Sequence, residues 1–98
     1  MKNNKDKTSA EVNKRFFDAL DYIMSKGRIR GVGTFCNDYG LNRIKYLGVR
    51  QTIRKTDPAD YIEYKNIDVS ALVFLCRDFG ISTDWLLLGE GKMFKGGI

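Results

Sequence analysis

The sequence contains no histidine, only one proline and only two cysteines among its 98 residues. Histidine is the most common general base in enzymes, and zinc sites are usually built from histidines and closely spaced cysteines. The chain also lacks a recognisable carboxylate pair, a nucleophile elbow and a glycine loop of the kind that cradles phosphates. We therefore expect neither an enzyme nor a bound metal or cofactor.

Long apolar stretches are missing as well. No run approaches the roughly 20 residues that a membrane helix needs, and the first residues, MKNNKDK, have no apolar region typical of a secretory signal. Cys36 and Cys76 lie far apart on predicted apolar faces, where free cysteines behave as small hydrophobic residues. These features predict a protein of the reducing cytoplasm with no membrane partner.

The charge is unevenly distributed. Residues 1–55 carry 13 Lys/Arg and 5 Asp/Glu, a net +8, whereas residues 56–98 carry 4 and 7, a net −3. A basic half is typical of nucleic-acid binders, although many basic surfaces bind nothing. The length and the apolar fraction of 43% predict one globular domain with one core.

Residues 32–51, VGTFCNDYGLNRIKYLGVRQ, have the pattern of two helices joined by a tight turn. Phe35 and Tyr39 are four residues apart and so share a helical face, beside the small Cys36. Gly40 can adopt the positive φ that a sharp helix stop often requires. We predict the turn at Gly40, with the first helix starting near residue 31 or 32.

The second helix is expected from about Asn42, a good N-cap, towards Lys55, with Asp57–Pro58 ending it. Its buried face is formed by Tyr46, Val49 and Ile53. Its outward face carries residues that can bond base edges and phosphates, namely Asn42, Arg43, Lys45, Arg50, Gln51 and Arg54. If Ile44 and Leu47 also point outward, they make this face unusually apolar, suited to thymine methyl groups or to a protein contact.

A second register, with the turn at Gly48, fits residues 47–53. It would bury the charge of Arg43 and place bulky Ile44 at a close helix contact, and both are costly. With the turn at Gly40, Gly48 falls inside the second helix at a cost of about 1 kcal/mol relative to Ala. Gly48 either allows close approach to a phosphate or weakens the helix.

The residues before this pair of helices form a polar tail and one long helix. Residues 1–7 are expected to be disordered, and Thr8–Glu11 reads as a capping box at the helix start. The apolar stripe of this helix is Val12, Phe16, Leu20 and Ile23, flanked by Phe17 and Met24. Gly27 ends the helix, and Arg28 and Arg30 follow in a short basic connection that can hold phosphates.

After the pair, residues 56–67 form either an ordered loop or a small hairpin with residues 51–54. Asp68 is predicted to cap a helix that Gly80 ends, with the apolar face Val69, Leu72, Val73, Cys76 and Phe79. Ser82 caps a last short helix, in which Trp85 and Leu88 are candidate homodimer contacts. The alternative is that Trp85 and Leu86 join the core and Leu88 packs under a flexible exit, residues 90–98.

Residues 32–51 resemble the helix-turn-helix of the lambda-repressor-like family. Its apolar, small and glycine positions are filled in order by Phe35, Cys36, Tyr39, Gly40, Leu41, Tyr46 and Val49. Residues 81–94, ISTDWLLLGEGKMF, are similar to the close of many phage-repressor-type domains. Where the family usually has a Ser or Thr cap and a polar first residue, this chain has Gly31 and Val32.

The resemblance implies an all-α fold: a compact bundle of about five short helices in residues 8–89, with a central helix-turn-helix. It also implies a transcriptional regulator that binds double-stranded DNA, often a phage or mobile-element repressor and often a homodimer. The expected base readers are Asn42, Arg43, Lys45 and Gln51, with Arg43 gripping guanine. The expected phosphate contacts are Arg28, Arg30, Arg50, Arg54 and Lys55. The rival hypothesis is a degenerate helix-turn-helix module, antitoxin-like or anti-repressor-like, that contacts protein instead of DNA.

Overall fold

The computed structural model describes residues 3–55 and 67–95, with side chains described from residue 8 to 54 in the first range. These residues form four α-helices and one short π-helix. In chain order they are α1 (Asn3–Ser25), α2 (Val32–Tyr39), α3 (Arg43–Lys55), α4 (Val69–Phe79) and η1 (Asp84–Leu88). The predicted all-α bundle is confirmed.

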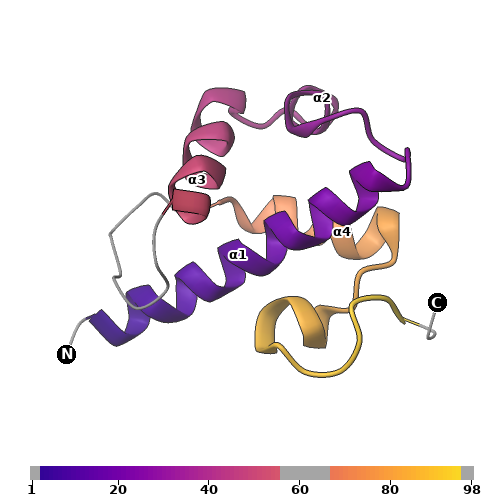
Figure 1. Ribbon diagram of the computed structural model, residues 1–98. Coiled ribbons are helices and arrows are strands. Elements are labelled where there is room, and N and C mark those ends of the chain that lie inside the picture. The colour runs from indigo at the N-terminus through magenta and orange to yellow at the C-terminus, as the bar shows by residue number, and fades with distance from the viewer. Residues whose placement is uncertain (1–2, 56–66, 96–98) are drawn as a thin grey trace.

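The long helix α1 is the centre of the arrangement. In the view of Figure 1, α2 and α3 lie above α1 and η1 lies below it. α2 and α3 pack against each other, while α1 contacts α3, α4 and η1. The pair α2–α3 is thus separated from η1 by α1.

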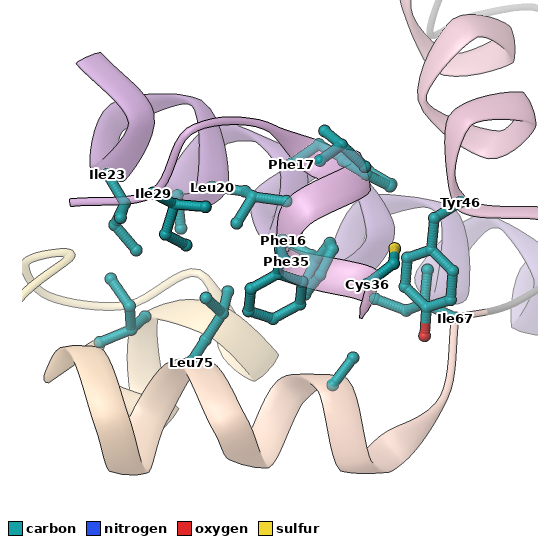
Figure 2. Close-up of a cluster of buried hydrophobic side chains, with 14 of the residues drawn as sticks. Phe16, Phe17, Leu20, Ile23, Ile29, Phe35, Cys36, Tyr46, Ile67 and Leu75 are labelled. Carbon is teal, nitrogen blue, oxygen red and sulfur yellow. The ribbon is translucent and has the colours of Figure 1, made fainter. Parts of the chain in front are cut away.

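Aromatic side chains join the helices in the core. The Phe16 ring on α1 lies edge-on to Phe17 at a centroid distance of 4.9 Å, and 6.0 Å from both Phe35 on α2 and Tyr46 on α3. Figure 2 shows these rings together with Cys36 and Leu75, and all except Phe17 are at most 1% exposed. Edge-on aromatic contacts add to the stabilisation that burial of the rings provides.

Two predicted boundaries are wrong. Helix α1 begins at Asn3, so residues 3–7, expected to be a disordered tail, are helical and Thr8 lies inside the helix. Residues 3–7 contain no Pro or Gly to interrupt a helix. The supposed flexible exit is also partly ordered, because the Ser82 amide donates to the Met93 carbonyl at 2.7 Å and the Lys95 amide to the Gly80 carbonyl at 3.0 Å.

The predicted buried face of α4 is also shifted. Val69 is 74% exposed and Val73 is exposed as well, whereas Ala71 and Leu75 are fully buried. Apolar residues surround most of this helix, so its sequence alone fits more than one rotation about the helix axis. The predicted buried faces of α1 and α3 agree better with the structure. Phe16, Leu20 and Ile23 of α1 lie in the core, and so do Tyr46 and Val49 of α3.

The predicted alternative of a hairpin with residues 51–54 is wrong, because those residues belong to helix α3. Residues 56–66 themselves lie outside the described residues, and Ile67 is buried. Among the helices that the structure describes, none combines the length and the apolar character needed to cross a bilayer.

Candidate nucleic-acid interface

The turn between α2 and α3 is set by Gly40. Its φ of 68° and ψ of 32° are left-handed, and the amide of Leu41 donates to the Cys36 carbonyl at 2.8 Å. Only glycine adopts this conformation without strain. Asn42 then caps α3, because its side-chain oxygen accepts the Lys45 amide hydrogen at 3.0 Å. The turn at Gly40 is confirmed, and α3 runs without a break through Gly48.

Tyr46 fixes the start of α3 against α4. Its hydroxyl donates to Oδ2 of Asp68 at 2.7 Å and accepts the backbone amide hydrogen of Asp68 at 2.9 Å. Burial, followed by the hydrogen bond to Asp68, raises the pKa of Tyr46, and the same hydrogen bond lowers the pKa of Asp68. Asp68 occupies the predicted N-cap position of α4, but its carboxylate bonds to Tyr46 instead of capping the helix. These hydrogen bonds hold the first turns of α3 in a fixed orientation relative to the start of α4, which is distant in sequence.

The outer face of α3 is exposed and has an apolar centre. Ile44 is 83% exposed and Leu47 is 40% exposed, and Gly48 and Gln51 are also exposed. Arg43 flanks this centre, and its side chain lies along α2, where a Cβ added to Gly33 would be 3.2 Å from Cδ of Arg43. The sequence of α3 has five basic residues and no acidic one.

The four predicted base readers fall into two groups. Arg43 and Gln51 are exposed and, in the part of the chain that is described, neither makes an ion pair or a side-chain hydrogen bond. Lys45 instead turns towards α4, with Nζ 3.6 Å from Oδ1 of Asp68. Asn42 uses its carbonyl oxygen in the cap of α3. The structure thus leaves Arg43 and Gln51 free to contact a ligand.

The five predicted phosphate contacts are also divided. Nη2 of Arg50 lies 3.0 Å from Oδ1 of Asp21, and Arg54 pairs with the other oxygen of the same carboxylate. The Arg28 guanidinium lies over the Phe79 ring, 5.1 Å from its centroid, and Arg30 is exposed. The side chain of Lys55, the last residue of α3, lies outside the described residues.

Sequence reasoning missed Asp21. The sequence around Asp21 in α1 does not indicate that its carboxylate will contact Arg50, which lies 29 residues further along the chain in α3. A weak signal was available, since Arg50 and Arg54 are four residues apart and therefore share a helix face that one acid can serve. Their pairing with Asp21 makes both arginines less available to phosphates than predicted.

The candidate dimer contacts differ in exposure. Trp85 is partly buried and packs against the core, Leu86 is fully buried, and Leu88 is 64% exposed. A groove of about 500 Å³ separates α4 from η1. Its lining is mostly apolar and comprises Val69, Leu72, Val73, Cys76, Arg77, Thr83, Leu86, Leu87 and Lys95.

Comparison of the chain with models of protein families, with curated proteins and with solved structures finds no match. The site must be interpreted from its own chemistry. It presents a helix, anchored by Tyr46, whose exposed side chains without an ion pair in the described chain are a guanidinium, an amide and two alkyl groups. Such a surface can contact base edges, phosphates or another protein.

Proposed function

We propose that this protein is a sequence-specific regulator that binds double-stranded DNA. In this proposal α3 enters the major groove and α2 lies across the sugar-phosphate backbone. The observation that carries it is the α2–Gly40–α3 unit, which presents an exposed helix face without acidic residues and anchors that helix through buried Tyr46. A helix of ordinary diameter fits the major groove, which is about 12 Å wide.

The free side chains suggest how binding is divided. Arg43 can donate two hydrogen bonds to guanine, and Gln51 can bond adenine, both from the outer face of α3. Arg28 and Arg30 precede the start of α2, and in this proposal they contact phosphates. The resemblance in sequence extends the proposal to a cytoplasmic repressor of the phage or mobile-element type.

The proposal is tested by selecting bound sites from a random duplex pool and titrating the enriched site at several salt concentrations. We expect an enriched motif and an affinity that falls steeply with salt. Arg43→Ala should weaken binding to the selected site more than to random DNA, by about 1–3 kcal/mol for a lost guanine contact. Lys92→Ala is the control, since Lys92 is an exposed cation outside both α3 and the groove between α4 and η1.

The rival function is a protein-interaction module that does not bind DNA. It is favoured by the exposed alkyl groups of Ile44 and Leu47 and by the pairing of Arg50 and Arg54 with Asp21. If the purified chain shows no binding to random duplex DNA even at low salt concentration, DNA binding is overturned and the interaction module is favoured.

We also propose that the protein forms a homodimer through the groove between α4 and η1. Val69, Val73 and Leu87 line this groove and are exposed, and Leu88, which follows Leu87 in η1, is exposed as well. Figure 1 places η1 on the other side of α1 from α3, so pairing there leaves α3 available to DNA. A two-fold dimer would bind half-sites about one helical turn apart.

The oligomeric state is measured by sedimentation velocity over a range of concentrations. We expect a dimer that Val73→Glu converts to a monomer, while Ser70→Glu, on the same helix and also exposed, leaves it intact. A wild-type chain that stays monomeric throughout would overturn the dimer and leave DNA binding untouched.

A further inference from the structure

The middle of the outer face of α3 is alkyl in character. Ile44 and Leu47 are three residues apart, and Gly48 follows Ile44 by four, so the three residues form one continuous patch on the helix surface. Ile44 is among the most exposed large hydrophobic residues described. Neither Ile44 nor Leu47 belongs to the buried core or to the side chains packed against it.

In residues 3–55 and 67–95, nothing around Gly48 requires glycine. A Cβ added there would meet nothing within 4 Å, and its φ is not positive. Glycine weakens a helix relative to alanine. A glycine that the fold does not need, on a face that nothing in the described chain covers, leaves room for close approach by an external partner.

The charge and the size of this surface indicate which partner fits. Lys45, Arg50 and Arg54 of α3 are paired with Asp68 and Asp21, which leaves Arg43 as the unpaired cation beside this patch in the described chain. Arg43 favours a partner that carries negative charge. Two alkyl side chains are too few for a stable protein interface, which buries about 800 Å² on each partner. The major groove of DNA combines flanking phosphates with small apolar groups, because thymine presents its 5-methyl group there.

We propose that Ile44, Leu47 and Gly48 contact thymine 5-methyl groups, so that the bound site carries thymine opposite the middle of α3. This inference rests on the proposed DNA-binding function and specifies its sequence preference. Ile44 and Leu47 would supply the alkyl contacts, and Gly48 would let the backbone of α3 come close enough for both to be made.

Replacing thymine with uracil tests this directly, since uracil lacks only the methyl group and keeps the same base pair. In the site selected from a random pool, each contacted thymine is replaced in turn by deoxyuridine. Burial of one such carbon predicts about a fourfold loss of affinity for each contacted methyl group. Ile44→Ala should weaken binding to the thymine site and show little further loss with deoxyuridine.

Val69→Ala is the matched control, because Val69 is a similarly exposed aliphatic residue on α4. Since Val69 also lines the groove proposed for dimerisation, this control compares the ratio of affinities for the thymine and uracil sites and not the affinity itself. This variant should keep the full sensitivity to deoxyuridine. Both substitutions remove exposed side chains, and circular dichroism checks that each variant is folded.

The possible outcomes separate this inference from the function on which it rests. Equal binding of the thymine and uracil sites by the wild-type chain would overturn the methyl contacts while leaving sequence-specific binding in place. Full uracil sensitivity in both Ile44→Ala and Leu47→Ala would overturn the assignment to these residues. A chain that selects no site at all overturns both proposals.

Discussion

Nη2 of Arg50 lies 3.0 Å from Oδ1 of Asp21, an ion pair that joins α3 to α1. Arg54 bonds the second oxygen of the same carboxylate, so the three groups together carry a net charge of +1. A DNA phosphate that binds either arginine must therefore compete with an acid already in place. We therefore expect Asp21 to limit how much of the positive charge of α3 is available to the proposed DNA ligand.

Asp21→Asn should strengthen binding to random duplex DNA. Removing the carboxylate frees two guanidinium groups, and each new phosphate contact steepens the slope of log affinity against log salt by about 0.9. Fluorescence anisotropy at a series of salt concentrations measures both quantities. We expect only a small loss of stability, at most about 1 kcal/mol, because the pair is partly solvent-exposed.

Asp18→Asn provides the control for net charge. Asp18 is on the same helix and pairs with Lys14 instead of the arginines of α3. Equal changes in affinity from the two substitutions would show a general charge effect and contradict the specific competition.

The link between Tyr46 and Asp68 predicts how stability depends on pH. The folded-state pKa of Asp68 is lowered, chiefly by the Tyr46 hydroxyl, so its stabilising contribution is present above the unfolded pKa and is lost as the pH falls through the folded pKa. The pKa of Tyr46 is raised, so its contribution is lost only in strong alkali, as the pH rises from the unfolded value near 10. Asp68→Asn should therefore flatten the acid limb of the stability profile, and Tyr46→Phe the alkaline limb.

Denaturant unfolding at pH values from 2 to 11 measures both limbs. Asp78→Asn serves as a comparison, because Arg77 and then Tyr39 also lower the pKa of Asp78, which pairs with an exposed arginine on its own helix. An acid limb that Asp68→Asn leaves unchanged would show that this carboxylate is not linked to folding.

Local patterns were sufficient to predict the α2–α3 unit. The turn requires a left-handed conformation at position 40, which glycine adopts and few other residues tolerate. Phe35 and Tyr46 lie on the buried faces of α2 and α3, and helical spacing identifies those faces. The alternative register at Gly48 failed on a physical argument about burying Arg43, and Arg43 is indeed exposed. Turn, faces and register all depend on residues close together in sequence.

Side-chain orientations that the sequence did not predict depend on distant partners. Lys45 turns away from the outer face because Asp68, 23 residues further along the chain, attracts it. Arg50 turns towards Asp21 for the same reason. The rotation of α4 follows from contacts with other helices, since its own sequence is apolar on most sides. Helical periodicity identifies which residues share a face but gives no information about what that face meets.

Arg15 should be important for holding η1 against α1. Its Nε donates to the Leu86 carbonyl at 2.8 Å and its Nη2 to the Leu87 carbonyl at 3.1 Å. Arg15→Ala should lower the free energy of unfolding by about 1–3 kcal/mol, as expected for loss of hydrogen bonds from a charged group. The only tryptophan, Trp85, lies in η1, so its emission should shift to longer wavelength.

Lys14→Ala is the control for Arg15, because Lys14 is the neighbouring cation and pairs only with exposed Asp18. Its effect on stability should stay below about 0.5 kcal/mol. Unchanged Trp85 emission in Arg15→Ala would show that η1 is held by its apolar contacts alone.

Gly48→Ala should separate stability from binding. The added methyl group meets nothing within 4 Å inside the protein, and alanine favours the helix by up to about 1 kcal/mol, so the variant should be more stable. On DNA the same methyl group would hold α3 away from the groove and weaken binding to the selected site. Denaturant unfolding and anisotropy measure the two effects, with Ser70→Ala, at an exposed position of α4, as a substitution that should leave binding unchanged. A Gly48→Ala chain that is more stable and binds as tightly as wild type would mean that the glycine serves no external contact.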